Sequence, residues 1–266
     1  MKTAGHPRIG YCSSMNRLLP LTLLLLALPL HAQQEPDYSA WNHLLQTYYD
    51  PAHGMKYLQL KARDEKTLEA VKQALGHVNV ASLNRKQQLA YWINVYNVNS
   101  VATIVESYPV DSIRDISTDP IRRLNVFAKE RIPFGGALLS LDNVENDKIR
   151  TEFHDPRIHF AINCAARSCP PIRAEAYTGE RVDAQLDDQV RKYLSVIRFG
   201  KKGNTLVLHV TKIMDWFGKD FEEWGGGKIP FIRRFVGPDK QKLIDAAKGD
   251  IELEYDDYDW ALNDWK

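Results

Sequence analysis

The sequence predicts a single compact α+β domain, in which helices dominate the first half and strands appear later. Stretches with apolar residues at helical spacing come early, short alternating stretches come late, and no internal repeat interrupts the order. We expect one central, buried helix among the N-terminal helices. A mostly antiparallel sheet is expected in the C-terminal half.

The chain begins with a segment typical of a secretory leader. Arg17 precedes an almost unbroken apolar stretch over residues 18–30, and a small-residue exit and polar residues follow. The stretch contains two prolines and is shorter than the roughly 20 apolar residues that a membrane span needs, so no membrane anchor is expected after cleavage. The pattern fits best when counted from Met15, with residues 1–14 as an upstream extension. We expect residues 1–32 to be removed and the protein to be periplasmic or secreted.

Removal of the leader changes both the charge and the cysteine content. Three basic residues and no acidic residue are lost, so the formal net charge moves from +1 to −2, and nothing in this balance suggests a nucleic-acid partner. Cys12 is lost as well, which leaves Cys164 and Cys169 in a chain of about 234 residues. An even number of cysteines in an exported protein usually indicates a disulfide.

The first two helices are predicted from apolar spacing and from signals at their ends. Residues 38–49 place apolar side chains on one face after Asp37, a typical N-cap residue. A short strand is expected at residues 54–60. A second helix is expected at residues 64–75, and Gly76 ends it.

The most apolar helix is expected at residues 84–108. Apolar side chains cover most of its circumference, which is typical of a helix buried on all sides. Pro109 ends it, because the residue before a proline resists helical geometry. Residues 111–136 mix arginine, proline and glycine, and we expect loops and a hairpin there.

The second half combines strands with shorter helices. Ser140 is a good N-cap for a helix over residues 141–153, and residues 157–163 alternate in the manner of a strand. Apolar residues four apart then predict a helix at residues 182–194. The remaining elements are expected to be a strand, three helices and a last strand, at residues 204–210, 211–221, 229–235, 239–247 and 251–255.

Cys164 and Cys169 form the first group of residues that suggests chemistry. A thiol nucleophile needs a lowered pKa and a base within hydrogen-bond reach. His159 precedes Cys164 by five residues, a spacing that puts the two on opposite faces of an unbroken strand. They can pair only if the chain turns near Asn163.

The sequence leaves other arrangements of these thiols open. His53, His154 and His209 are alternative bases whose distance from the thiols the sequence does not give. Cys164 and Cys169 are also compatible with a local disulfide, which would contribute about 2 kcal/mol by the chain-entropy relation and fix the following turn. Free buried thiols without catalysis are a third interpretation.

Two asparagines of the predicted buried helix form the second group. Asn94 and Asn97 are three residues apart and therefore neighbours on one face. A buried carboxamide without partners costs about 1 to 3 kcal/mol, so each must bond to something specific. Either they tie the helix to backbone groups of adjacent loops, or one of them lines a site and orients an imidazole or holds an oxyanion.

No cofactor or metal is expected. The three glycines at residues 225–227 lack both phosphate-loop patterns. The two cysteines have no second pair and no closely spaced histidines, as a zinc site would require. The acidic residues near the C-terminus lack the glycine and terminal glutamate of a calcium loop, and the alternation of Glu252, Glu254 and Asp256 fits the solvent-exposed face of an edge strand.

Four separated segments of the chain resemble the DUF547 family, a domain of unknown function found in exported bacterial proteins. The resemblance spans roughly residues 38–264, and its segments are residues 90–97, 140–150, 158–164 with Ser168 and Pro170-Pro171, and 258–263. The family carries a cysteine at the position of Cys164, whereas the position of Cys169 is often serine. The resemblance therefore argues against an obligatory disulfide.

The resemblance also affects which residue is the better candidate for the base that would activate the Cys164 thiol. The family often shows Glu-His where this chain has Glu145-Asn146, so that imidazole is missing here. His159 matches the family and becomes the better candidate for the base.

Two hypotheses from different classes follow. In the first, the protein is a thiol-dependent hydrolase or acyl transferase in which Cys164 attacks and His159 takes the proton. Asn94 or Asn97 then orients the ring or holds the oxyanion. In the second, it is a non-enzymatic cell-envelope protein that binds a peptide, glycan or protein partner and contains a structural Cys164–Cys169 disulfide.

Overall fold

A computed structural model of the protein describes residues 1–2, 5, 34–116 and 125–266. The expected leader over residues 1–32, with its start at Met15, lies outside these residues except at positions 1, 2 and 5. Residues 117–124 of the expected loop region also lie outside. The described residues from 34 onward belong to one compact unit. Within the described ranges, no helix has the length and apolar character needed to cross a membrane.

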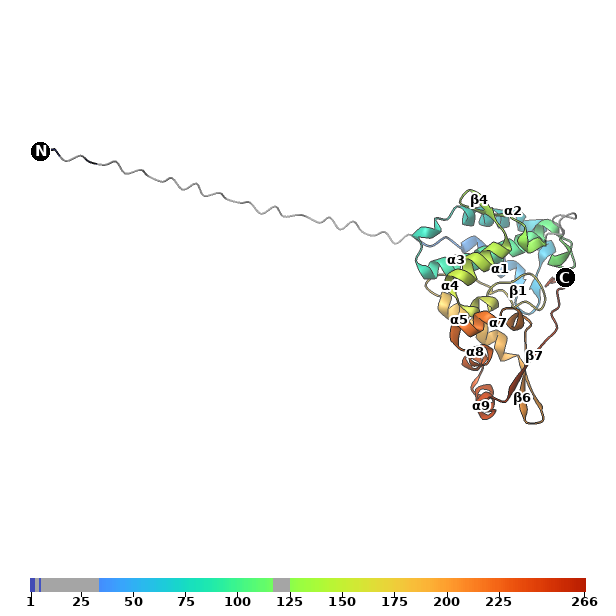
Figure 1. The fold of residues 1–266 in the computed structure, drawn as a ribbon. Helices are drawn as coiled ribbons and strands as arrows, with labels where there is room; N and C mark the ends of the chain where they lie inside the picture. Colours follow the sequence, from blue (N-terminus) through green and yellow to red (C-terminus); the bar gives the residue numbers. More distant parts are fainter. Residues whose placement is uncertain (3–4, 6–33, 117–124) are drawn as a thin grey trace. The chain divides into compact units, whose positions relative to one another are not determined.

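Helices and small sheets together confirm the α+β class (Figure 1). The α-helices of the described residues are α1 (Ser39–Tyr48), α2 (Tyr57–Gly76), α3 (Arg85–Ser107), α4 (Thr151–Phe153), α5 (Val182–Ser195), α6 (Ile213–Trp216), α7 (Gly218–Gly225), α8 (Lys228–Phe235) and α9 (Pro238–Ala246). The strands are β1 (Tyr49–Asp50), β2 (Gly54–Met55), β3 (Ile132–Phe134), β4 (Ala137–Leu139), β5 (Arg198–Lys202), β6 (Thr205–Val210) and β7 (Ile251–Tyr255). Tighter or wider helical turns are η1 (Val80–Ser82), η2 (Ile113–Asp115), η3 (Val126–Ala128), η4 (Asn143–Arg150) and η5 (Pro156–Phe160).

Helix α3 is the buried helix that the sequence predicts. Every residue from Leu89 to Val105 is buried, because α2 and other elements cover it on all sides. The helix begins with a capping box: the Asn84 side chain accepts hydrogen bonds from the N–H groups of Lys86 and Gln87, and the Gln87 side chain accepts one from the Asn84 N–H. A rigid, buried helix is thus available to position other groups.

The strands form three small sheets. β1 pairs with β2 and β3 with β4, each pair antiparallel, and the β3–β4 pair is the hairpin expected after the loop region. In the C-terminal sheet, β5 is antiparallel to β6 but β7 is parallel to it. The parallel pairing arises because α6 to α9 form a crossover connection between β6 and β7.

Two stretches expected to be strands are helical instead. Residues 157–163 form the end of η5 and a turn, since Pro156 suits a first helical position and the Asp155 side chain accepts a hydrogen bond from the Arg157 N–H (3.0 Å). Of residues 54–60, only the first two pair as a strand, and α2 begins at Tyr57.

The alternation in residues 157–163 has a physical origin other than a strand. The structure has two hydrophobic clusters, a larger one around α1 to α3 and a smaller one around α5, α7, α8 and β6. Ile158 belongs to the larger cluster and Phe160 to the smaller one. His159 therefore lies where the two clusters meet.

The segment after β7 returns to the first half of the chain. The Leu262 N–H donates to the Asp111 carbonyl oxygen (2.7 Å), and the Asn263 N–H donates to the Ala165 carbonyl oxygen (2.9 Å). Gly54 has a φ of 100°, and a Cβ there would lie 2.0 Å from the carbonyl oxygen of Asn263. Glycine at position 54 thus permits the docking that brings residues 258–260 close to Cys164.

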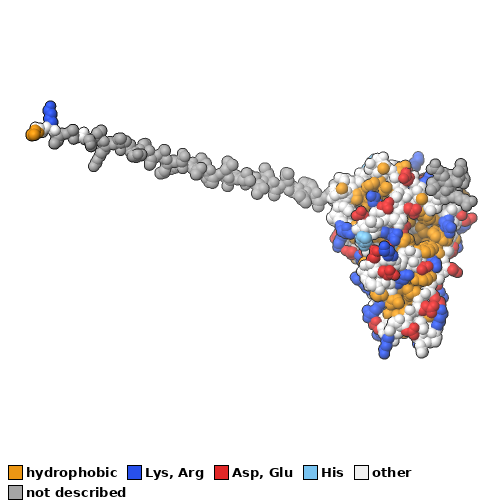
Figure 2. Space-filling view, viewed as in Figure 1, with side chains coloured by type: hydrophobic (Ala, Val, Ile, Leu, Met, Phe, Trp, Pro, Cys, Tyr) orange, Lys and Arg blue, Asp and Glu red, His pale blue; other side chains and the backbone are white. Residues whose placement is uncertain are grey.

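Charged and hydrophobic side chains share the surface. On the face in Figure 2, basic and acidic side chains are interspersed and hydrophobic side chains form patches between them. Among the large hydrophobic residues, Trp216 leaves 47% of its surface exposed.

Candidate functional site

Cys164 lies on a tight loop that α3 holds in place. Asn97 accepts a hydrogen bond from the Asn163 N–H (2.9 Å) and donates one to the carbonyl oxygen of Ala161 (2.9 Å). The Asn163 side chain in turn accepts a hydrogen bond from the Ala165 N–H (2.7 Å), where the backbone has a positive φ of 64°. The backbone on both sides of Cys164 is therefore fixed to the core.

Both cysteines are free thiols in the structure, so the disulfide considered from the sequence is not formed. Each sulfur has polar partners of its own. The Cys164 N–H donates to the sulfur of Cys169 (3.2 Å), which also lies 3.7 Å from the Ile162 carbonyl oxygen. The sulfur of Cys164 lies 3.3 Å from the hydroxyl oxygen of Tyr258.

These contacts favour the thiolate form of Cys164. Hydrogen bonding by the Cys169 thiol lowers the pKa of Cys164 to about 7 against the opposing effect of burial, and the Tyr258 hydroxyl and the Ala166 N–H act in the same direction. Burial and the neighbouring Cys164 hold the pKa of Cys169 well above its usual range. Cys164 is thus the more readily ionised thiol of the pair, and Cys169 remains protonated.

A cavity of about 170 Å³ adjoins the Cys164 sulfur, and we call it the small cavity. Its polar floor consists of Asp142, Glu145, His159 and Cys164. Its aromatic rim consists of Trp216, Tyr258 and Trp260. Tyr96, Phe127, Ile162, Cys169, Ile213 and Phe217 complete the lining.

Glu145 is brought to the polar floor by the π-helical segment η4. The segment begins with reciprocal bonds between Ser140 and Asn143: the Ser140 Oγ accepts from the Asn143 N–H (3.0 Å), and the Asn143 Oδ1 accepts from the Ser140 N–H (3.0 Å). This confirms Ser140 as the start of the predicted helix. Wide π-helical turns are frequent at functional sites because they rotate side chains out of the regular helical register.

Glu145 has the protonation behaviour of a group that can both give and take a proton near neutral pH. Burial, with a further effect of the charge on Cys164, raises the pKa of Glu145 to about 7. Arg150 and a hydrogen bond with Tyr96 oppose this rise. Such a carboxyl group beside a thiolate is suited to general acid and base catalysis.

His159 is held by Asp220 rather than by Cys164. Its Nε2 lies 2.7 Å from the Asp220 Oδ2, and its ring stacks on Phe217 with 4.1 Å between centroids. Arg150 donates two further bonds to Asp220, each of 2.8 Å. Burial lowers the pKa of His159, so its ring is neutral at pH 7. Although burial opposes it, the bonds from Arg150 and His159 hold the pKa of Asp220 far below its usual value.

One protein-family model matches the part of the chain that contains Cys164. Residues 80–194 match the family model DUF547, described as a protein of unknown function. This segment of the chain is therefore a DUF547 segment. Searches of curated proteins and of solved structures found no match to the chain.

The matched DUF547 segment and the cavity overlap only in part. The segment contains the whole polar floor and the helix α3 that supports it. The aromatic rim and Asp220 lie after residue 194, outside the match. The match therefore covers the reactive part of the site and leaves out the part that surrounds it.

Asn94 and Asn97 do not line the small cavity. Asn94 accepts a hydrogen bond from the Tyr177 N–H (3.0 Å) and donates to the Tyr177 carbonyl oxygen (2.8 Å). Asn97 bonds to the loop before Cys164, as described above. Both therefore tie α3 to neighbouring backbone, the first of the two interpretations drawn from the sequence.

Of the four histidines considered as bases, only His159 lines the small cavity. The chain turns after η5, and His159 and Cys164 both line the small cavity, as the catalytic hypothesis requires. No hydrogen bond joins them within the part of the chain that the structure describes. His53, His154 and His209 instead lie beside Asp50, Glu223 and Glu254, away from this cavity.

Four residues of the site are not among the candidates predicted from the sequence: Glu145, Tyr258, Asp220 and Trp216. A signal was available for the first two, since both lie in segments that resemble the family. Asp220 and Trp216 lie in no such segment, and only the fold brings them to the site.

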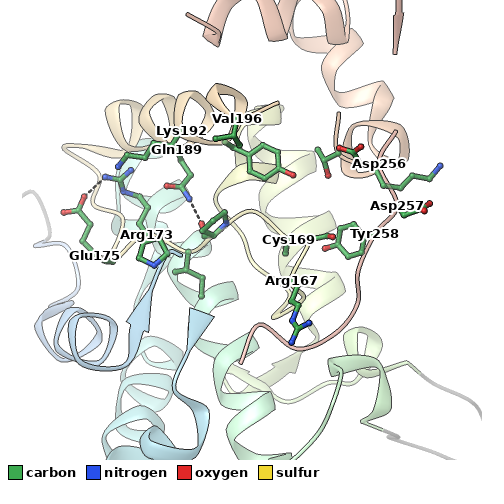
Figure 3. Close-up of a pocket in the computed structure, with 18 of the residues that line it drawn as sticks. Arg167, Cys169, Arg173, Glu175, Gln189, Lys192, Val196, Asp256, Asp257 and Tyr258 are labelled. Carbon is green, nitrogen blue, oxygen red and sulfur yellow. Dashed lines mark hydrogen bonds and ion pairs between the residues drawn. The ribbon is translucent and has the colours of Figure 1, made fainter. Parts of the chain in front are cut away.

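A second, wider cavity of about 680 Å³ lies beside the small one. Cys169 and Tyr258 line both cavities and form a wall between them. In Figure 3 these two side chains lie together on one side of the wide cavity, and Arg173, Glu175 and Lys192 lie on the other. The wide cavity lacks Cys164, so any covalent chemistry at that sulfur takes place in the small cavity.

Proposed function

We propose that this protein is an exported thiol-dependent hydrolase or acyl transferase with Cys164 as its nucleophile. One observation carries the proposal: a half-buried thiol with a pKa of about 7 shares a cavity with a carboxyl group whose pKa is also about 7. The leader-like start of the sequence supports export to the periplasm or the medium.

The proposed reaction has two stages. The Cys164 thiolate attacks a carbonyl carbon, and the carbonyl electron pair moves to oxygen, where the Tyr258 hydroxyl is a nearby donor. Collapse of this intermediate expels the leaving group with a proton from Glu145 and leaves a thioester. Glu145, now ionised, takes a proton from water or from another molecule that accepts the acyl group. The deprotonated molecule attacks the thioester and releases Cys164 as the thiolate.

His159 is the second candidate for the proton acceptor. If its Nε2–H donates to Asp220, the Nδ1 lone pair is available as a base, and Asp220 holds the ring in that tautomer. Glu145 is the stronger candidate because the charge on Cys164 acts directly on it and raises its pKa.

Acylation by an activated ester tests the proposal. The full chain is mixed with p-nitrophenyl acetate, nitrophenolate release is followed, and the acetyl group is located by peptide mass mapping so that Cys12 is counted separately. We expect a burst of release and an acetyl group on Cys164. Cys164→Ser should abolish both while unfolding like the wild type, and the matched variant Cys169→Ser should still be acetylated at Cys164.

Two further variants separate the proton acceptors. Glu145→Gln should slow release of the acetyl group about 100-fold or more if Glu145 is the base, as general catalysis typically contributes. His159→Gln should slow the release of the acetyl group instead if His159 is the base. Acetylation of Cys164 at the same rate in native and urea-unfolded protein would refute the enzymatic proposal, because the folded site would then add nothing.

The wide cavity supports a second candidate function, a binding protein of the cell envelope. Its volume of about 680 Å³ lies in the range of small-molecule sites, and charges of both signs line it. A peptide or glycan that protects the wide cavity from hydrogen exchange, without any acylation of Cys164, would favour this function.

A further inference from the structure

We propose that the small cavity binds an alkylammonium group, so that the molecule attacked by Cys164 carries a primary or quaternary ammonium near its carbonyl carbon. The binding site is inferred from its own lining. Only the statement that the ammonium belongs to a substrate rests on the proposed function.

The aromatic rim has the composition of a cation site. The ring centroids of Trp216 and Tyr258 are 4.9 Å apart, those of Tyr258 and Trp260 are 4.7 Å apart, and those of Trp216 and Trp260 are 5.9 Å apart. Clustered tryptophan and tyrosine rings attract cations that come within about 6 Å of a ring centroid. Nearly half of the Trp216 surface is open to such a contact.

A cation of the chain already uses this surface. The guanidinium carbon of Arg114 lies 4.9 Å from the Trp260 ring centroid. Arg114 is itself exposed and does not line the small cavity. A ring of the rim therefore already contacts a positive charge, from a residue that does not line the cavity.

The polar floor adds negative charge that no lining residue balances. Asp142 and Glu145 carry carboxyl groups, Cys164 carries a thiol that ionises readily, and no lysine or arginine is among the described lining residues. The nearest cation on the same helical segment, Arg150, is bound by Asp220 through two bonds of 2.8 Å. Burial raises the pKa of both carboxyl groups, although Arg150 partly opposes this at Glu145, and a bound cation would lower both pKa values.

Size and charge together select among ligands. A volume of about 170 Å³ is well below the 300 to 1,000 Å³ typical of sites for whole drug-sized molecules, so the cavity takes one group of a larger molecule. Aromatic rings alone would also accept a sugar face or an alkyl chain. Two carboxyl groups behind the rings favour a positive group over these neutral ones.

Binding of tetramethylammonium tests the inference without any chemistry. The Cys164→Ser full chain is titrated with tetramethylammonium chloride at constant ionic strength, and tryptophan fluorescence is recorded, with tert-butanol as a neutral ligand of similar shape. We expect saturable binding of the cation at least tenfold tighter than that of the alcohol. Trp216→Ala and Glu145→Gln should each weaken it about three- to tenfold.

Trp265→Ala is the matched control, because Trp265 also contacts a cation, the Lys56 ammonium at 3.8 Å, but does not line the small cavity. It should bind tetramethylammonium like the parent. Equal affinity for cation and alcohol, or equal loss in all three variants, would overturn the inference. Acylation of Cys164 without cation binding would refute the inference alone, and cation binding without acylation would refute the proposed function alone.

Discussion

The polar floor and the aromatic rim of the small cavity are built in different ways. The floor is fixed by hydrogen bonds to buried groups, such as those of Asn97 to the loop of Cys164 and of Asp220 to His159. The rim combines Trp216 of α6 with Tyr258 and Trp260 of the segment after β7, and these partly exposed side chains contact one another through their rings.

This difference separates two properties of the site. Buried, directional bonds make the geometry of the floor part of the stability of the protein. Exposed ring contacts can be altered with little effect on folding. Reactivity should therefore be tied to the fold, whereas ligand preference should be adjustable at the rim.

The largest effect is expected from Asn97→Ala, which removes the support of the floor. Two buried backbone groups, the Asn163 N–H and the Ala161 carbonyl, lose their partner, so the free energy of unfolding should fall by about 3 kcal/mol. Urea denaturation measures this change. The exposed Asn79, whose side chain bonds to no described residue, is the control, and Asn79→Ala should change stability by less than about 0.5 kcal/mol. Equal stability of the two variants would mean that α3 does not support the floor.

The next largest effect is expected from Asp220→Asn. The substitution leaves Arg150 without its carboxylate and weakens the bond to His159, and because these groups are partly buried the loss should be about 2 kcal/mol at pH 7. Asp215→Asn, at an exposed pair with Lys212, should cost much less, because solvent screens exposed ion pairs. Thermal unfolding of both variants provides the test, and a loss for Asp215→Asn as large as that for Asp220→Asn would contradict it.

Glu145→Gln should change stability only at higher pH. The folded-state pKa of Glu145, about 7, is above its unfolded value, so the associated stability is fully present below the unfolded pKa and is lost as pH rises through 7. Glutamine avoids this loss, and the variant should be about 1 to 2 kcal/mol more stable than the wild type at pH 8 and similar to it at pH 4. Urea unfolding at both pH values measures the difference. Glu152→Gln, at an exposed site on α4, should leave the stability unchanged at both pH values.

Tyr258→Phe is expected to have the smallest effect on stability but a visible one on reactivity. Loss of the hydroxyl 3.3 Å from the Cys164 sulfur should raise the pKa of that thiol and slow its alkylation by iodoacetamide about threefold to tenfold at pH 7. Tyr255→Phe removes a hydroxyl that bonds to Lys228 instead and should leave the rate unchanged. The alkylation rate is also measured as a function of pH. If the midpoint of this profile is unchanged in Tyr258→Phe, the rim does not influence the pKa of Cys164.

The sequence predicts the parts of the molecule that depend on local pattern. The apolar circumference of α3 and its ending before Pro109 both follow from residues close together in the chain. The prediction of a strand at residues 157–163 was wrong because the alternating apolar side chains enter two different clusters. Their spacing is that of a strand, but the backbone is helical.

Most of the site depends on contacts that no local pattern reports. Tyr258 is 94 residues from Cys164, and Asp220 is 61 residues from His159. Periodicity indicates that a side chain is buried but does not indicate its partner. Glu145 is a different case, because its motif was visible but the unusual π-helical turn that directs it to Cys164 was not.

The docking of residues 258–263 also determines when the sulfur becomes reactive. A contact between groups 94 residues apart forms late, after long-range closure of the chain. Until then Cys164 lacks the Tyr258 hydroxyl and the ordered loop around it, and its thiol has the low reactivity of an ordinary cysteine. A chain in which this segment has not yet docked would thus lack full nucleophilicity at Cys164.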